Sequence, residues 1–359
     1  MLYGLRCENK GFKKVKISFA QIFFVLTILY LPGGTTSARE IIDMAGRHVI
    51  VPDVINKVFG SSPPATYMIY AIDPGMIAGL NFNLRSSEKQ YMDKRLHQLP
   101  VVGGQPGQGA APDFEVLLKV KPDIILVWMW KQLSAANEKM ENKLKALGIP
   151  VVYIAMDSLT EYPQAFRFLG DLLNHKERAE ALAIYAEQTI EETKKVSGAI
   201  QTKERVSVYY AEGADGLSTE CHTSVHAQLI PLGGAINVHR CSNTNPYGMQ
   251  KISIEQVINY NPQVIVTHDS MFLSRIKKDE RWKNIRAVRD DRVYRIPTTS
   301  FNWFDRPPSF MRLLGLKWIT NKLYPDTYTV DMNAETRSFY KLFLNATLDE
   351  PSAREILQK

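Results

Sequence analysis

Residues 115–128 read EVLLKVKPDIILVW, and this stretch decides the fold class of the chain. Its second half is a short apolar run, residues 124–128, that begins directly after Lys121-Pro122-Asp123. A short apolar run of this kind, bounded by a turn signal, is typical of a strand buried on both faces. Because such strands alternate with amphipathic helices in βαβ units, the stretch predicts a parallel sheet covered by helices.

The same alternation extends in both directions from this stretch. Apolar residues at helical spacing fill residues 133–147 and again residues 163–196. Further apolar runs that predict strands cover residues 49–51, 151–154, 206–210, 264–267 and 293–296. The pattern therefore predicts an α/β chain made of two α/β units joined by a helical stretch.

The boundaries of these parts follow from the positions of the runs. The N-terminal unit is expected over residues 39–162, the linking helices over 163–198 and the C-terminal unit over 199–325. Residues 326–359 show no strong periodicity, so this tail is expected to form a short helix or to fray.

Composition and charge set further limits. The chain has 359 residues, of which 45 % are apolar and 23 % charged, which excludes disorder, collagen and a disulfide-rich miniprotein. Residues 1–38 combine a basic start, an uncharged apolar run over 17–31 and small residues before Arg39. These three parts are typical of a cleavable secretory signal peptide, and the run is shorter than the ~18 residues of a membrane anchor, which is the alternative.

Cleavage near Ala38 changes the charge of the mature chain. It removes five basic residues and one acidic residue, so the net charge falls from +7 to +3. A charge of this size gives no reason to expect nucleic-acid binding. We expect the mature protein in the periplasm, in contact with the membrane only through a partner.

The familiar catalytic motifs are missing from the sequence. It contains no G-x-x-x-x-G-K-[ST] loop, no G-x-S-x-G elbow, no H-E-x-x-H and no paired C-x-x-C motif. An exported α/β chain without these motifs is expected to be a binding protein, not an enzyme, and to need no cofactor. A remote alternative is a secreted metalloenzyme that uses His222, His226 and His239.

Two cysteines remain in the mature chain, Cys221 and Cys241. In an oxidising compartment they form a natural disulfide pair, although two free thiols or a metal site shared with a histidine are open alternatives. His222 and His226 lie four residues apart and His239 lies close to Cys241, so these histidines are candidate metal ligands. The serines and threonines around them also fit a helix N-cap, in which case the histidines are structural.

Six segments, taken in chain order, resemble one known family, the periplasmic binding proteins that serve ABC importers of ferric siderophores, haem and cobalamin. The resemblance covers about residues 41–324. The segments are DMAGRHVIVP (43–52), EVLLKVKPD (115–123), GG with NV (233–234 and 237–238), SIEQV with NPQVI (253–257 and 261–265), WKNI with AV and VY (282–285, 287–288 and 293–294), and RPP with LLGL (306–308 and 313–316).

The resemblance implies the fold of a class III periplasmic binding protein. In that fold one long backbone helix joins two Rossmann-like lobes, and the ligand lies in the cleft between them. It also implies delivery of a metal chelate to an ABC transporter permease dimer, with one docking carboxylate per lobe. By motif position these are Glu115 and Glu255, whose alternative role is to favour a helix N-terminus through the dipole. The main alternative ligand is an oxyanion of the molybdate or tungstate type.

Candidate ligand-binding residues lie at predicted strand ends and in the segment before the last predicted helices. For the tryptophans the alternative is core packing, although Trp128 occupies a position similar to a cleft tryptophan of cobalamin binders. Arg306 is a candidate for neutralising an anionic ligand, or alternatively pairs with Asp305 or a neighbour. The complete set is Trp128, Trp130, Tyr210, His222, Trp303 and Arg306.

Overall fold

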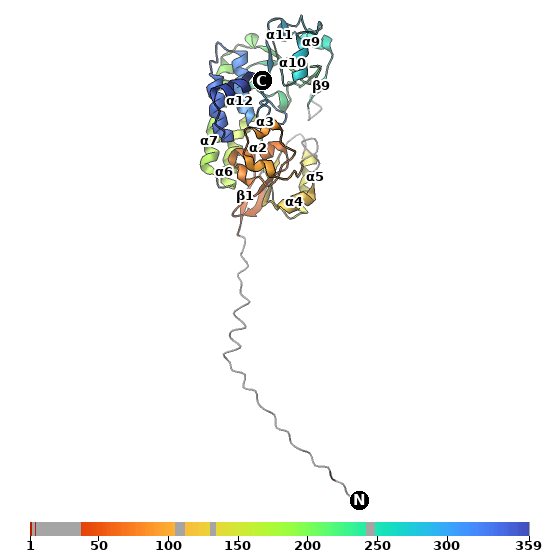
Figure 1. The fold of residues 1–359 in the computed structure, drawn as a ribbon, viewed down its shortest axis with the longest axis vertical. Coiled ribbons are helices and arrows are strands. Elements are labelled where there is room, and N and C mark those ends of the chain that lie inside the picture. The colour runs from red at the N-terminus through yellow and green to blue at the C-terminus, as the bar shows by residue number, and fades with distance from the viewer. Residues whose placement is uncertain (2–3, 5–36, 105–111, 130–133, 242–247, 359) are drawn as a thin grey trace. The chain divides into compact units, whose positions relative to one another are not determined.

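A computed structural model describes residues 1, 4, 37–104, 112–129, 134–241 and 248–358 (Figure 1). In its first half three described strands form a parallel sheet in the order β3-β4-β5. Their bounds are Val58–Gly60, Ile124–Trp128 and Val151–Ile154. All three strands are fully buried, which explains why their sequences are apolar throughout rather than alternating.

Helices of different lengths surround this first sheet. The principal ones are α2 (Pro63–Ile72), α4 (Phe114–Val120), α5 (Ser134–Lys145) and α6 (Tyr162–Leu172). Shorter helical segments are η1 (Pro74–Met76), α3 (Ser86–Lys89), η2 (Lys94–Gln98) and η4 (Leu159–Glu161).

The second half repeats this arrangement around a parallel sheet in the order β11-β10-β6-β8. The strands are β6 (Ser207–Ala211), β8 (Ile236–Asn237), β10 (Val264–Thr267) and β11 (Val293–Arg295). A small antiparallel pair consists of β7 (Ser218–Thr219) and β9 (Gln250–Lys251). The helices of this second half are η5 (Thr202–Glu204), η6 (Val225–Ala227), α8 (Leu229–Leu232), α9 (Ile254–Tyr260), α10 (Ser270–Ile276), α11 (Arg286–Arg289) and α12 (Met311–Leu323).

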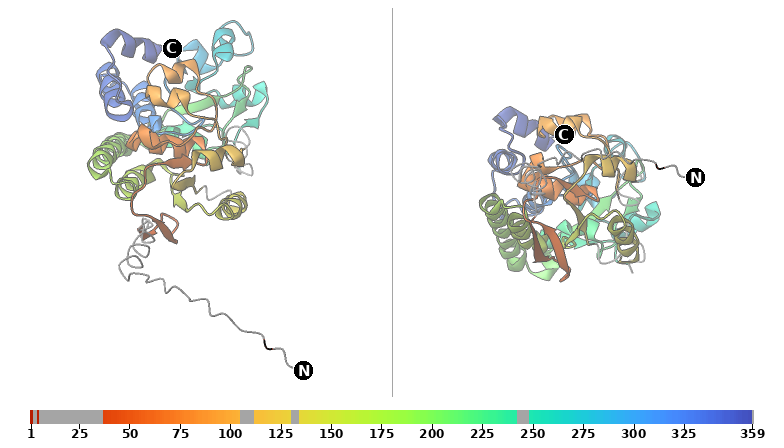
Figure 2. Two further views of the ribbon diagram at one scale, coloured as in Figure 1. Left: turned by 60° about the horizontal axis from the view of Figure 1, so that its bottom comes forward. Right: turned by 90° about the horizontal axis from the view of Figure 1, so that it is seen from below.

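A single long helix, α7 (Lys176–Ala199), joins the two halves. Its 24 residues correspond to about 36 Å at 1.5 Å per residue, enough to span a small domain. Figure 2 shows this helix in green beside the two sheets. The predicted class of two α/β lobes on one backbone helix is therefore confirmed.

The sequence pattern predicted that the apolar run 49–51 is a strand of the first α/β unit. In the structure this run does not join the parallel sheet. It lies in β2 (His48–Pro52), which forms an antiparallel hairpin with β1 (Ala38–Ile42). The turn of this hairpin is tied to the sheet by buried Asp43, which accepts hydrogen bonds from Arg47 Nε at 2.9 Å and from Tyr153 N at 3.1 Å. The D-x-x-G-R segment is thus held in the fold through the side chain of Asp43.

The C-terminal tail forms two helices, where a single short helix or a frayed end was expected. It forms α13 (Met332–Leu344) and α14 (Glu350–Gln358). Phe339 and Phe343 stack with their ring centroids 4.2 Å apart, and Phe343 also lies 6.0 Å from Phe166 of α6. Because aromatic residues four apart share one helix face, α13 buries an apolar stripe against the first half of the chain.

No helix among the described residues is both long and apolar enough to cross a membrane. The apolar run 17–31 lies outside the described residues.

Candidate functional site

The carboxyl-terminal edge of the second sheet carries a cluster of polar side chains. Strands β6 and β10 are parallel neighbours that end at Ala211 and Thr267, so Glu212 and His268 follow at the same edge. Ligands of open α/β sheets bind outside this edge. The loop between β11 and α12 returns to this point and contributes Asp305 and Arg306.

Arg306 is the centre of the cluster. Its Nε lies 2.5 Å from Glu212 Oε1 and 3.5 Å from Asp305 Oδ2, and its Nη2 forms an ion pair with Glu220. The three carboxyl groups each place an oxygen within 4.8 Å of the others, and all three are buried. The Arg306 side chain is 24 % exposed, whereas the side chains of Glu212, Glu220 and Asp305 are fully buried.

A second layer of groups fixes the carboxylates. Tyr210 donates its hydroxyl proton to Asp305 Oδ1 at 2.7 Å, and His226 Nδ1 lies 2.9 Å from Asp305 Oδ2. Glu220 accepts hydrogen bonds from Ser224 Oγ at 2.8 Å and from the backbone N–H of Met249 at 2.9 Å. These contacts pre-organise Arg306, because the groups that hold it cannot move independently.

The pKa values of Glu212 and Asp305 are shifted in opposite directions within the cluster. Burial, followed by the charge of Asp305, raises the pKa of Glu212 from 4.5 to about 9. Burial alone would also raise the pKa of Asp305, but the bond from His226 and the charge of Arg306 hold it below its usual value. Glu212 is therefore mostly protonated at neutral pH, which lowers the negative charge around Arg306.

Glu212→Gln is expected to flatten the pH dependence of stability. Because the pKa of Glu212 rises from 4.5 to about 9 on folding, the folded chain binds more protons than the unfolded chain between these pH values. The stabilisation from this proton is complete below pH 4.5 and is lost as the pH rises towards 9. Urea unfolding at pH 5 and pH 8 should show a drop that is larger in wild type than in the variant by about 1 kcal/mol or more. Equal drops in both proteins would show that Glu212 does not titrate in this range.

A second feature is the close match between helices α4 and α9. Each has seven residues, carries an exposed glutamate in its first turn and ends at a residue in the left-handed conformation before a proline. In α4 these are Glu115 and Lys121 (φ 48°), and in α9 they are Glu255 and Asn261 (φ 41°). Asp113 and Ser253 cap the two helices with side-chain oxygens. Figure 1 shows α4 and α9 at opposite ends of the folded part of the chain.

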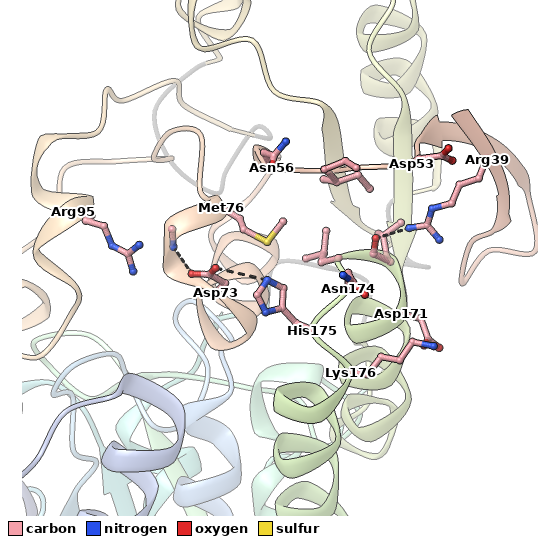
Figure 3. A pocket seen from close by; sticks show the side chains of 15 residues that line it. Arg39, Asp53, Asn56, Asp73, Met76, Arg95, Asp171, Asn174, His175 and Lys176 are labelled. Carbon is pink, nitrogen blue, oxygen red and sulfur yellow. Dashed lines mark hydrogen bonds and ion pairs between the residues drawn. The ribbon is translucent and has the colours of Figure 1, made fainter. Parts of the chain in front are cut away.

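A cavity of about 730 Å³ lies elsewhere, between the end of α2 and the turn from α6 to α7 (Figure 3). Several of its charged side chains are already paired: Asp73 with His175 at 3.7 Å and Asp171 with Lys176 at 3.0 Å. Arg39 donates to the carbonyl oxygen of Leu172 at 2.6 Å. This cavity shares no lining residue with the Arg306 cluster.

Comparison with known proteins decides the family. The model of the family described as "Periplasmic binding protein" matches residues 83–299. This chain belongs to that family. The fold also matches a solved ABC transporter solute binding protein from Sulfurospirillum deleyianum DSM 6946 with a TM-score of 0.84 and 35 % identity, covering 89 % of this chain and 99 % of that one.

Curated relatives of this periplasmic binding protein differ in what they bind. The molybdate-binding protein MolA of Haemophilus influenzae is 24 % identical over 88 % of this chain and 93 % of the relative. A vitamin B12-binding protein of Pectobacterium atrosepticum is 30 % identical over 58 % of this chain and 70 % of the relative. The predicted class, a solute-binding protein of an ABC importer, is confirmed, while the relatives do not select one solute.

Two of the tryptophans expected to bind the ligand, Trp128 and Trp303, are buried in this periplasmic binding protein. Trp128 is buried in the first half, and its indole N–H donates to Asp157 Oδ1 at 3.0 Å. Trp303 is also buried, and its indole N–H donates to the carbonyl oxygen of Thr299 at 2.9 Å. Both side chains thus have the burial of core residues, which is the alternative given above for the tryptophans. Trp130 lies outside the described residues.

Among the described residues, the three candidate metal-binding histidines form no common group of metal-binding atoms, although the backbone N–H of His222 donates to the carbonyl oxygen of His239 at 3.0 Å. His239 is buried, with its ring nitrogens 3.0 Å from Tyr260 Oη and 2.9 Å from Gln250 Oε1. His226 pairs with Asp305, while Nδ1 of His222 lies beside the backbone N–H of Cys241 at 3.4 Å. Among the described residues, the carboxylates around Arg306 are the one group of three possible metal-binding side chains.

Other expected residues are placed as follows. The sulfur atoms of Cys221 and Cys241 form a disulfide, with the Cα atoms 5.5 Å apart. Tyr210 and Arg306 both belong to the cluster, where Tyr210 is buried and donates a hydrogen bond to Asp305. The sequence reasoning did not single out Glu212 or Glu220. The signal for Glu212 is its position, because an acidic residue directly after a buried strand lies at the ligand edge of the sheet.

Proposed function

We propose that this chain is exported by a cleavable signal peptide, residues 1–38, and works as the periplasmic component of an ABC importer. It binds a solute without transforming it and transfers it to the membrane permease dimer. The proposal is supported by the family match and by the two equivalent helices, α4 and α9, each with an exposed first-turn glutamate. Paired carboxylates of this kind orient a partner that carries basic groups.

The solute is proposed to be an anionic metal chelate of the ferric siderophore class. The observation that carries this is Arg306, an arginine fixed by three buried carboxyl groups at the ligand edge of the sheet and still 24 % exposed. A guanidinium binds carboxylate or phenolate-type oxygens through its planar set of donors. Haem and cobalamin are less favoured, because Trp128 and Trp303 are buried and present no stacking surface.

A molybdate-type oxyanion is the second candidate. Alignment coverage favours this candidate. The alignment with this chain covers 93 % of the MolA relative but only 70 % of the vitamin B12-binding relative. An oxyanion would also use the donors of Arg306, so the two candidates share one chemistry at this residue.

Elemental analysis of cells tests the proposal and separates its two forms. A strain that lacks the gene and the same strain with the gene restored are grown at low metal supply. The metal contents of both are measured by mass spectrometry. Loss of iron in the deletion strain supports a ferric chelate, and loss of molybdenum supports an oxyanion. Equal contents of every metal in both strains would contradict the import function.

A further inference from the structure

Two adjacent serines lie at the carboxyl-terminal edge of the first sheet. Ser61 and Ser62 follow directly after β3 and precede α2, and ligands of open α/β sheets bind outside this edge. The two residues are 3 % and 0 % exposed, and neither hydroxyl has a hydrogen-bond partner among the described residues. Because buried polar groups are nearly always hydrogen-bonded, two neighbouring unpaired hydroxyls need an explanation.

The start of α2 has further donors without an acceptor. Ser62 is the N-cap residue, where a serine usually accepts a bond from a first-turn N–H, but its side chain makes no such bond. Pro63 and Pro64 remove two of the first-turn N–H groups. The first bond inside the helix runs from the N–H of Thr66 to the carbonyl oxygen of Ser62 at 3.0 Å, so the N–H of Ala65 has no acceptor within α2. Two hydroxyls and one backbone donor therefore meet at the start of this ten-residue helix.

The backbone around the two serines is held firmly. The N–H of Ser61 donates to the carbonyl oxygen of Leu126 at 2.9 Å, and the carbonyl oxygen of Gly60 accepts from Asn81 Nδ2 at 2.8 Å. A Cβ at Gly60 would lie only 2.5 Å from the backbone nitrogen of Thr66, so this position requires glycine for α2 to start so close to β3. Donors that are unpaired but held on a fixed backbone are typical of a pre-formed ligand site.

The surroundings of the two serines favour an anion. The N-terminus of a helix is the positive end of its dipole, and the first turn of α2 contains no acidic residue. Hydroxyl and N–H donors at such an N-terminus bind oxyanion oxygens. The ring centroid of Tyr67 in α2 lies 4.0 Å from that of Phe301, which belongs to the same loop as Arg306. The loop that carries Arg306 therefore passes beside α2.

We propose that Ser61 and Ser62, together with the N–H of Ala65, bind an oxyanion oxygen of the solute from the first half of the chain, while Arg306 binds the solute from the second half. This inference rests on the proposed function and names a group that the solute carries. A free metal oxyanion supplies such oxygens, and so do the deprotonated carboxylate or catecholate groups of a ferric chelate. The two sources share one chemistry at this subsite and are separated by the choice of probe.

Solute affinity tests the subsite. The double variant Ser61→Ala with Ser62→Ala and the wild-type chain are titrated with molybdate, with tungstate and with a ferric tris-catecholate by isothermal calorimetry. We expect the probe that binds wild type to bind the double variant about 10- to 100-fold more weakly. Binding of molybdate or tungstate identifies a free oxyanion as the source of the oxygens, and binding of the tris-catecholate identifies a chelate.

The melting temperature of the solute-free protein distinguishes a binding role from a structural one. Because neither serine hydroxyl is paired, the double variant is expected to melt at the wild-type temperature or slightly above it. Ser309→Ala makes the same change at a buried serine whose hydroxyl accepts a bond from the N–H of Met311 at 3.1 Å, so this control is expected to melt lower.

Two results would overturn the subsite: wild-type affinity in the double variant, or a fall in its melting temperature as large as that of Ser309→Ala. A wild-type chain that binds none of the probes would contradict the proposed function as well as the subsite. Binding by wild type that the double variant retains would contradict the subsite alone, so the two failures are distinguishable.

Discussion

Glu115→Gln together with Glu255→Gln is expected to lower solute uptake by at least about tenfold, with no change in solute affinity. Both carboxylates are exposed in the first turns of their helices, and the residues that hold Arg306 lie elsewhere in the chain. The substitutions keep the shape of both side chains and remove only the charges that are proposed to meet the partner. Uptake is measured with labelled solute in the deletion strain that carries each variant.

The alternative role of the two glutamates is to stabilise the N-termini of their own helices. A substitution of Glu177 serves as the control for this role. Glu177 is an exposed glutamate in the first turn of α7, so Glu177→Gln removes the same interaction with a helix dipole at another place. We expect Glu177→Gln to leave uptake unchanged. Reduced solute affinity in the double variant, or an equal loss of uptake in Glu177→Gln, would refute a docking role for Glu115 and Glu255.

Arg306→Ala is expected to abolish detectable solute binding and to lower the free energy of unfolding by about 3–5 kcal/mol. The substitution leaves Glu212, Glu220 and Asp305 within 4.8 Å of one another without their cation. It also removes the guanidinium that is proposed to meet the solute. Urea unfolding and isothermal titration with the solute measure the two effects separately.

A compensated variant separates stability from binding at Arg306. Arg306→Met combined with Glu212→Gln and Glu220→Gln removes the cation together with two of the carboxylates, so much of the lost stability should return. Solute binding should remain absent, because no guanidinium is present. Restored binding in this variant would show that Arg306 contributes to folding only.

The architecture could be predicted because it depends on local patterns. Buried parallel strands are continuous apolar runs, and the helix spacing through residues 176–196 marked the long connection that is observed as α7. The glutamates of α4 and α9 could be located because both stand in segments that resemble the family's motifs, each two residues after the residue that caps its helix. The three-residue strand β3 escaped detection, since three residues are too few to show a pattern.

The candidate site around Arg306 could not be predicted in the same way, because it is assembled from residues far apart in the chain. Arg306 meets Glu212 across a separation of 94 residues and Glu220 across 86. Nothing in the local sequence indicates whether an aromatic residue at a strand end faces a cleft or the core. The burial of Trp128 and Trp303 could not be predicted for this reason. The tail was expected only as a short helix or a frayed end, because its apolar stripe packs on distant partners such as Phe166.

Direct binding to the mature chain, residues 39–359, tests the central claim. Binding is measured by thermal shift and by isothermal titration. The probes are ferric siderophores, haem, cobalamin, molybdate, tungstate, free Ni²⁺ and free Zn²⁺. We predict that a ferric siderophore, or failing that molybdate or tungstate, binds with one solute per chain and raises the melting temperature, and that Arg306→Ala removes this effect. Binding of free Ni²⁺ or Zn²⁺ alone, or of none of these probes, would contradict the proposal that the cleft holds an anionic, metal-containing solute.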